Sequence, residues 1–180
     1  MKKFKIFTIG HSTYDIKTFK KILKKYNIKQ IIDIRSIPYS KHNPQFNFDT
    51  FSKTLRNSKF GYRHLKILGG LRYAKKDSIN DAWINKSFRG FADYMQTKEF
   101  ENGLKTLIKI AKRKRVAIMC SEILPWRCHR SLIGDALLIR GFDVKDIYNI
   151  KTCKPHEITK WAKVNGMQIT YPKNKSILNF

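Results

Sequence analysis

Four short segments of the chain are rich in β-branched, aliphatic and aromatic residues. They are residues 2–9, 28–34, 116–120 and 144–150. Runs of this length and composition are typical of strands that are buried on both faces of a sheet. We therefore expect four strands here, with residues 167–171 as a late edge strand.

Between these segments, apolar residues recur every three or four positions, which indicates amphipathic helices. The marking positions are Ile16, Phe19, Leu23 and Tyr26; Phe51 and Leu55; Phe88, Phe91, Ala92 and Met95; and Phe100, Leu104, Leu107, Ile108 and Ala111. Ser12 or Thr13 is expected to cap the first of these helices. A further helix is expected over residues 131–140, closed by Gly141.

Strands that alternate with helices predict a mostly parallel sheet with helices on both faces. The C-terminal part adds one more expected helix, opened by Pro155 and containing Ile158 and Trp161. The predicted fold is thus an α/β, Rossmann-like three-layer sandwich, a single domain over residues 1–180 with four to five strands. In such sheets ligands bind beyond the carboxyl ends of the strands, so polar residues that follow strands are the candidates for a site.

The composition agrees with a globular protein. The chain has 180 residues, of which 42% are hydrophobic, enough to bury a core without disulfides or metals. No apolar run is long enough to span a membrane, and residues 1–5 lack the apolar stretch of a signal peptide. We expect a soluble cytoplasmic protein without a membrane partner, and cysteines (Cys120, Cys128, Cys153) that stay as thiols.

The formal net charge of +25 is the strongest compositional feature. A field of this size favours anionic partners, nucleic acids and nucleotides among them. The excess is mostly lysine spread along the whole chain, which a compositional bias of the genome would also produce. The arginines are the sharper indication, because several of them lie beside the candidate motifs.

The first predicted strand is followed by a glycine, His11 and Ser12. Glycine allows a tight turn, and His11 and Ser12 then stand at the start of a helix, which is a natural site for an anion. The same three residues also fit a plain glycine turn with a serine cap.

The second predicted strand ends at Asp33, Ile34 and Arg35. Alternation along a strand puts Asp33 and Arg35 on the same side. Two charged residues at a buried position either pair with each other or meet a ligand, so the segment predicts an ion pair or a binding site.

The third predicted strand ends in the densest cluster of reactive side chains in the chain. The cluster comprises Cys120, Glu122, Arg127, Cys128, His129 and Arg130. A thiol at a helix N-terminus beside arginines has a lowered pKa and is a candidate nucleophile, although Cys120 and Cys128 also fit a core role. Glu122 is the first candidate for a general acid or base and His129 the second. Arg130 or Arg127 would hold a phosphate or a carboxylate.

A metal site made of Cys120, Cys128 and His129 is conceivable. However, their spacing matches no zinc pattern, and no fourth ligand is apparent in the sequence. The Gly69-Gly70 pair is far from a Walker loop or a dinucleotide fingerprint. We therefore expect no metal and no cofactor.

The motifs that carry a family resemblance are residues 8–12, 33–35 with Pro38 and Ser40, 68–70, 119–122 and 125–133. Together they resemble the family catalogued as domain of unknown function 488. The likeness continues through residues 91–95 and reaches 155–156 and 171–172. It implies one compact α/β domain with its distinctive residues at strand ends, and it implies no particular reaction.

The first functional hypothesis is an enzyme, a hydrolase or a transferase, that acts on a phosphate-bearing substrate such as a nucleotide or a nucleic acid. Arg35 and Arg130 would hold the anion, and Glu122 would act as acid or base. Cys120 or Cys128 would be a nucleophile or a wall of the pocket, and His11 would orient the substrate or shuttle a proton. The alternative is a nucleic-acid-binding accessory protein without catalysis. A small-molecule or redox sensor built on Cys120 and Cys128 ranks third. The sequence makes no prediction of the oligomeric state.

Overall fold

A six-stranded sheet forms the centre of the protein, for which a computed structural model describes residues 4–173. Its strands are β1 (Lys5–Gly10), β2 (Gln30–Asp33), β3 (Gly61–His64), β4 (Val116–Cys120), β5 (Asp143–Ile147) and β6 (Cys153–Pro155). They lie in the order β3-β2-β4-β1-β5-β6, and only the β5–β6 pair is antiparallel. The predicted α/β class and mostly parallel sheet are confirmed, with six strands in place of four to five. The first two residues of the strand predicted from residue 2 lie outside the described residues.

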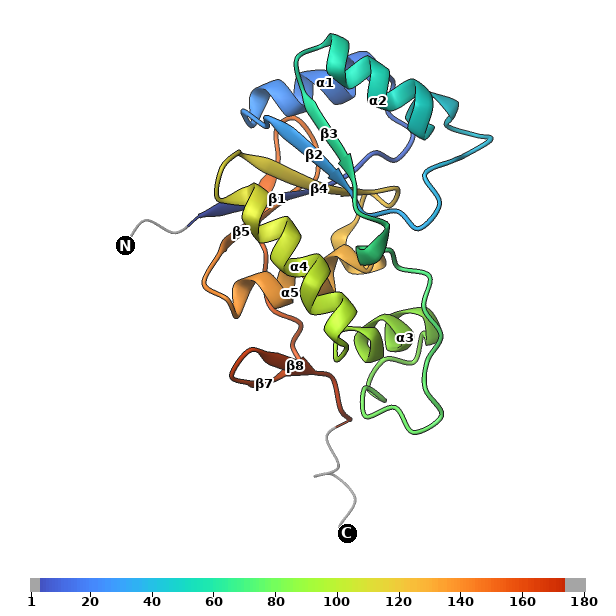
Figure 1. Cartoon of the computed structure of the whole chain (residues 1–180), viewed down its shortest axis with the longest axis vertical. Helices are drawn as coiled ribbons and strands as arrows, with labels where there is room; N and C mark the ends of the chain where they lie inside the picture. Colours follow the sequence, from blue (N-terminus) through green and yellow to red (C-terminus); the bar gives the residue numbers. More distant parts are fainter. Residues whose placement is uncertain (1–3, 174–180) are drawn as a thin grey trace.

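Helices cover both faces of this sheet (Figure 1). Helices α1 (Ile16–Lys25) and α2 (Phe48–Asn57) lie on one face, and α4 (Lys98–Ala111) and α5 (Arg130–Leu138) lie on the other. Helix α3 (Lys86–Tyr94) packs into the same core as α4 and α5. Short 3-10 turns, η1 (Pro44–Phe46), η2 (Lys66–Leu68) and η3 (Pro125–Arg127), join these elements.

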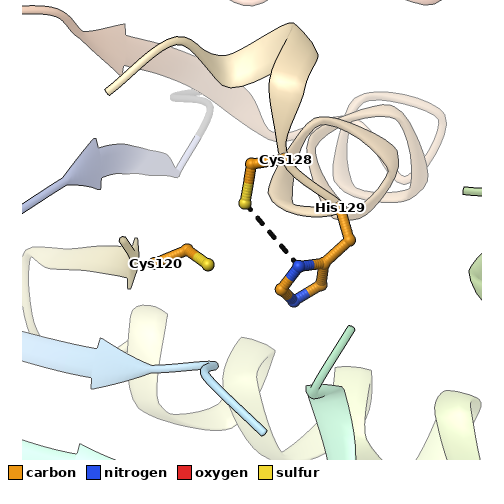
Figure 2. Close-up of side chains that lie close together, drawn as sticks. All are labelled: Cys120, Cys128 and His129. Atoms are coloured by element: carbon orange, nitrogen blue, oxygen red, sulfur yellow. Dashed lines mark hydrogen bonds between the residues drawn. The ribbon is translucent and has the colours of Figure 1, made fainter. Parts of the chain in front are cut away.

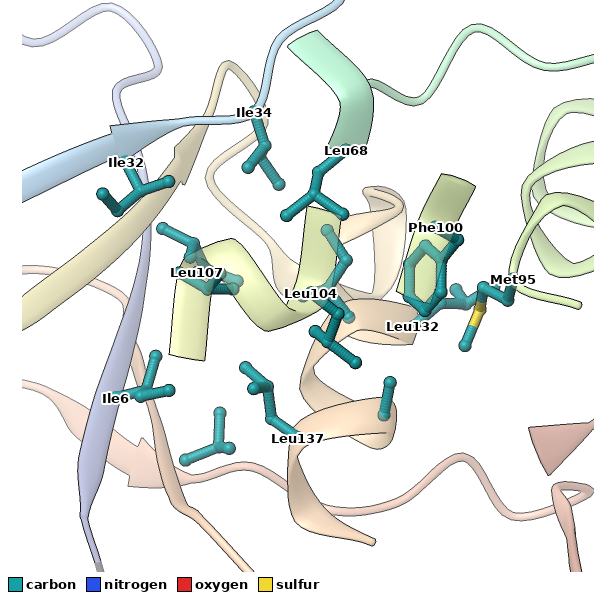
Figure 3. Close-up of a cluster of buried hydrophobic side chains, with 14 of the residues drawn as sticks. Ile6, Ile32, Ile34, Leu68, Met95, Phe100, Leu104, Leu107, Leu132 and Leu137 are labelled. Carbon is teal, nitrogen blue, oxygen red and sulfur yellow. The ribbon is translucent and has the colours of Figure 1, made fainter. Parts of the chain in front are cut away.

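Alternation along the central strands divides the buried residues into two cores. In β4, Ala117 and Met119 face α1 and α2, whereas Ile118 and Cys120 face α4 and α5. Figure 3 shows the core between the sheet and helices α4 and α5, where strand residues such as Ile32 pack near leucines of these helices. Because both faces are covered, the strands read as continuous apolar runs. The side chain of Cys120 is thereby directed toward the layer that contains the start of α5.

The start of α1 differs from the prediction. The N-cap is Asp15, whose carboxylate accepts a hydrogen bond from the backbone N–H of Thr18 at 2.8 Å. Ser12 and Thr13 therefore do not cap the helix, and His11 does not stand at its N-terminus. The cap therefore lies two or three residues later than expected, and within the longer turn Ser12 adopts a left-handed conformation, with φ of 46°.

The C-terminal part also differs. Pro155 is the last residue of strand β6 and opens no helix. The next residue stays hydrogen-bonded to β5, because the backbone N–H of His156 donates to the carbonyl of Val144. Ile158 and Trp161 lie in irregular structure, half exposed. The expected edge strand is β8 (Gln168–Thr170), which pairs with β7 (Lys163–Asn165) in a separate hairpin. Neither strand joins the main sheet.

Candidate functional site

A cavity of about 630 Å³ opens where β1, β2 and β4 end. It lies at the carboxyl ends of parallel strands, where ligand sites of α/β sheets are found. Of the ten residues predicted for a site, those that line it are His11, Ser12, Arg35, Cys120, Glu122, Arg127, Cys128 and His129. Asp33 and Arg130 do not line it. The structure therefore brings eight of the ten together in one hollow.

Asp33 and Arg35 form a buried ion pair. The Nε of Arg35 donates to Asp33 Oδ1 at 2.9 Å and its Nη2 donates to Oδ2 at 2.6 Å. Nη2 also donates to the carbonyl of Phe46, and Tyr62 Oη donates to Asp33 Oδ2 at 2.7 Å. Asp33 balances the charge of Arg35. Arg35 is therefore a fixed part of the cavity wall and not a free cation.

Tyr62→Phe tests this buried network. The variant is expected to lose about 1.5 kcal/mol of unfolding free energy, because the carboxylate of Asp33 loses one charge-assisted hydrogen bond. Equilibrium urea unfolding measures the loss. Tyr26→Phe is the matched control, since the Tyr26 hydroxyl donates at the exposed surface. Equal losses in both variants would contradict a special role for the Asp33 contact.

His11 presents a neutral imidazole to the cavity. Its Nδ1 lies 2.8 Å from the carbonyl of Ser12, which can only accept, and its Nε2 lies 3.3 Å from Nη1 of Arg35, which can only donate. These partners fix the tautomer with the proton on Nδ1. Burial, opposed by the Ser12 contact and aided by the charge of Arg35, lowers the pKa of His11. Stacking on Phe46, with ring centroids 4.3 Å apart, holds the ring in place.

Ser12 is held by the backbone beyond β4. The N–H groups of His11 and Ser12 donate to the carbonyls of Cys120 and Ser121. These bonds extend the β1–β4 pairing past the ends of the strands. They place the segment after β1 beside the segment after β4 at the cavity. The role of Ser12 as a helix cap at an anion site is therefore not realised, although its position in the cavity wall is.

Arg130 is enclosed in the protein and does not reach the cavity. It is fully buried, and its guanidinium donates to the carbonyls of Glu122 and Ile123. These two bonds fix the loop between β4 and α5 against the helix. Arg130 is thus a positioning residue, and its guanidinium does not line the cavity where an anion was expected.

Cys120, Cys128 and His129 converge at one end of the cavity. One ligand-type atom from each side chain lies within 4.8 Å of the other two (Figure 2). The Sγ of Cys128 lies 3.6 Å from Nδ1 of His129. On the far side of the ring, Nε2 of His129 donates to the carbonyl of Leu68 at 3.1 Å. The lone pair of Nδ1 therefore faces the sulfurs.

The two thiols differ in acidity. A hydrogen bond from the Cys128 thiol, together with the charge of Arg130, holds the pKa of Cys120 well below its usual value. Burial and the neighbouring Cys120 raise the pKa of Cys128. The thiol with the lowered pKa is therefore the one at the end of β4 and not the one in the segment before α5.

Glu122 and Arg127 are the exposed charged residues of the cavity wall. Within residues 4–173, the guanidinium of Arg127 makes no hydrogen bond or ion pair. Arg35, the other arginine of the wall, is already paired. Among the described residues, Arg127 therefore supplies an unpaired positive charge to the cavity wall, and the carboxylate of Glu122 supplies an unpaired negative charge to the same wall.

Several wall residues were not predicted. They come from loops and from the start of α3: Ser36, Ile37, Tyr39, Leu71, Ser87 and Phe88. No local pattern could have found them, because each is ordinary in its own segment and reaches the cavity only through the tertiary fold. Gly70, part of the Leu-Gly-Gly motif noted in the sequence, also lines the cavity.

These features define an α/β protein with a strand-end site, in which charged and sulfur-containing side chains share one hollow. The family model described as "Domain of unknown function DUF488" matches residues 15–137, and the chain belongs to this family. The matched segment includes Arg35, Cys120, Cys128 and His129, whereas His11 precedes it. No curated protein and no solved structure matches the chain. In the part of the chain that is described, no helix is long and apolar enough to cross a membrane.

Proposed function

We propose that the protein is an enzyme, a hydrolase or a transferase, that acts on a phosphate-bearing substrate of nucleotide size in the strand-end cavity. The observation that carries this proposal is that an unpaired cation, Arg127, and a reactive cluster around Cys120 line one hollow of about 630 Å³. Hollows of this volume are the usual sites of small-molecule ligands.

The anionic part of the substrate is assigned to the side of Arg127. A guanidinium offers paired N–H donors that match the oxygens of a phosphate. In the described residues, Arg127 is exposed and unpaired, whereas Arg35 is held by Asp33. No lysine of that part of the chain lines the cavity. The selectivity of the cavity for anions therefore depends on one or two arginines and not on the general charge of the surface.

An apolar section of the wall supports the nucleotide class. Tyr39 is 54% exposed and Leu71 is 67% exposed, and both line the cavity, as does Phe88. Exposed apolar groups around a hollow are typical of a binding surface, and aromatic rings stack well on nucleobases. A ligand with a phosphate at one end and a flat base at the other satisfies both sections of the wall.

The reactive part of the substrate is assigned to the end where Cys120 lies. Cys120 has a lowered pKa, and Glu122 offers a carboxylate at the same wall for acid or base catalysis. The neutral imidazole of His11 orients the substrate. These groups support either transfer to water or transfer to a second substrate.

The alternative is a nucleic-acid-binding accessory protein without catalysis. It is favoured by a second hollow of about 540 Å³ near the amino ends of β2 and β4. Basic residues there are Arg63, Lys109, Arg113 and Lys114. Affinity at such a surface falls steeply with salt, and it would not change in a variant of the strand-end cavity.

Arg127→Ala tests the first proposal. Binding of inorganic phosphate and of nucleoside monophosphates is measured by calorimetry at two salt concentrations. The variant is expected to bind about 10- to 100-fold more weakly, because a charged hydrogen-bond partner is lost. Arg113→Ala, in the second hollow, is the matched control and should bind like the wild type.

Equal losses in the two variants would assign anion binding to the general charge and overturn the proposal. A nucleotide that binds Cys120→Ser as tightly as the wild type, but is turned over only by the wild type, identifies the reactive end. Tight binding of polynucleotides that only Arg113→Ala weakens would favour the accessory protein.

A further inference from the structure

We propose that Cys120, Cys128 and His129 bind one zinc ion, with the fourth coordination position open to the strand-end cavity. The three side chains come from the end of β4 and from the segment just before α5. Figure 2 shows their ligand atoms directed toward a common space. The inference rests on the proposed function only for the use of the fourth position.

The distances fit tetrahedral coordination. Zinc lies about 2.3 Å from thiolate sulfur and about 2.0–2.1 Å from imidazole nitrogen. A tetrahedral angle then places sulfur and nitrogen about 3.6 Å apart and two sulfurs about 3.8 Å apart. The Sγ of Cys128 and Nδ1 of His129 are 3.6 Å apart, and all three ligand atoms lie within 4.8 Å of one another. Rotation of the side chains that moves the ligand atoms by about 1 Å or less brings them to these tetrahedral distances.

The surrounding hydrogen bonds are those that a zinc site requires. A metal-bound histidine usually donates its other N–H to a carbonyl or carboxylate, which fixes the tautomer. Nε2 of His129 donates in this way to Leu68, and Phe91 packs edge-on against the ring with centroids 4.8 Å apart. The backbone N–H of Arg130 points at Cys128 Sγ, 3.5 Å away. These contacts orient both ligands before any metal arrives.

The charge of the cluster also suits zinc. Two thiolates and a neutral imidazole carry two negative charges, which one Zn²⁺ ion balances. Soft sulfur ligands select zinc over magnesium or calcium, which prefer oxygen. Only the thiolate forms bind a metal, so uptake of zinc releases the thiol protons.

The cluster provides three protein ligands. Among residues 4–173, no fourth His, Cys, Asp or Glu joins it, and all three members line the cavity. Two cysteines and one histidine with an open fourth position is a ligand set of catalytic zinc sites. The open position would take a water molecule or a donor atom of the substrate. This would make the reactive end of the cavity a metal centre.

The spacing of the three ligands along the sequence does not predict a zinc site. Cys120 and Cys128 are separated by a loop that does not follow a zinc-finger pattern. The loop returns to the end of β4 because Arg130 binds the carbonyls of Glu122 and Ile123. The ligands are therefore brought together by a buried arginine and not by their separation along the chain.

The test uses the reduced, metal-free full-length protein and zinc alone. Titration against a chromogenic chelator is expected to give one zinc ion per chain for the wild type. Cys120→Ser and Cys128→Ser should each weaken binding by about 100-fold or more. Cys153→Ser is the matched control and should bind like the wild type, because Cys153 lies outside the cluster. Urea unfolding of each variant checks that it is folded.

Cobalt gives a second readout that does not depend on the variants. Co²⁺ bound by the wild type should show a thiolate-to-metal charge-transfer band and the visible bands of tetrahedral coordination. If the reduced wild type takes up no zinc, or if Cys120→Ser takes it up equally, the proposal is wrong. A reversible loss of two hydrogens that needs both Cys120 and Cys128, in a protein that takes up no zinc, would assign the pair to redox chemistry instead.

The result is separable from that of the proposed function. If the metal-free protein binds phosphate through Arg127 but no zinc, only the metal proposal fails. If zinc binds and neither phosphate nor nucleotides do, the metal centre stands and the substrate class is wrong.

Discussion

His156→Gln is expected to lose about 3–5 kcal/mol of unfolding free energy, the effect of removing one member of a buried ion network. Nδ1 of His156 lies 2.8 Å from Asp146 Oδ2, and Nε2 lies 3.1 Å from Asp135 Oδ1. Hydroxyls of Thr8 and Tyr171 donate to the same two carboxylates. Without the imidazolium, two buried carboxylates have no shared cation. Urea unfolding at neutral pH measures the loss, and the exposed His42→Gln is the control.

The same network makes stability depend on pH. Burial alone would lower the pKa of His156, but the contacts with Asp135 and Asp146 raise it from 6.5 to about 9. The folded state therefore holds the proton more tightly than the unfolded state does. The stabilisation, about 3 kcal/mol, is fully present below pH 6.5 and is lost as the pH rises through about 9. His156→Gln should lack this loss. Identical pH profiles of the wild type and the variant across this range would contradict the assignment.

Gly10→Ala is the second variant with a large expected effect, about 3 kcal/mol. A Cβ at this position would lie 1.8 Å from the carbonyl oxygen of Glu122 and 2.7 Å from Cα of Ile123. These are backbone atoms of the loop that carries the cavity wall, so the loop or the end of β1 must move. Zinc affinity should fall as well, because the loop sets the distance between Cys120 and Cys128.

Gly61→Ala is the matched control for this variant. A Cβ there meets only the flexible side chain of Gln30, at 3.1 Å. Its stability should stay within about 1 kcal/mol of the wild type. Unfolding by urea compares the two variants, and an undisturbed Gly10→Ala protein with unchanged zinc uptake would show that the loop is not held against β1.

The buried centre of the fold could be predicted from the sequence, and its edges could not. The apolar runs of β1, β2 and β4 are long and continuous because these strands are covered on both faces. Strand β3 was missed since Gly61–His64 is a half-buried edge with polar side chains. Near the C-terminus, Pro155 has the sequence pattern of a helix start, but pairing with β5 determined its conformation. Edge pairing is a tertiary effect that local patterns do not encode.

The position of the site could be predicted from the sequence, but the role of each arginine within it could not. Parallel strands place their carboxyl ends together, so residues after three strands were expected to meet. Arg127 and Arg130 are close neighbours in the sequence, yet one faces the cavity and the other is fully buried. Which arginine turns inward depends on the first turn of α5 and on the carbonyls that need donors. Neither can be read from residue type.

The central position of β1 has a consequence for how the protein acquires its cavity. This strand comes first in the chain but lies between β4 and β5, and Thr8 bonds to Asp146 across 138 residues. Contacts of such long range close large loops and are formed late and slowly during folding. The walls contributed by β1 and β4 therefore meet only after the segment between these two strands has been synthesised. A nascent chain that has not yet extended beyond β4 therefore holds no cavity at this edge of the sheet.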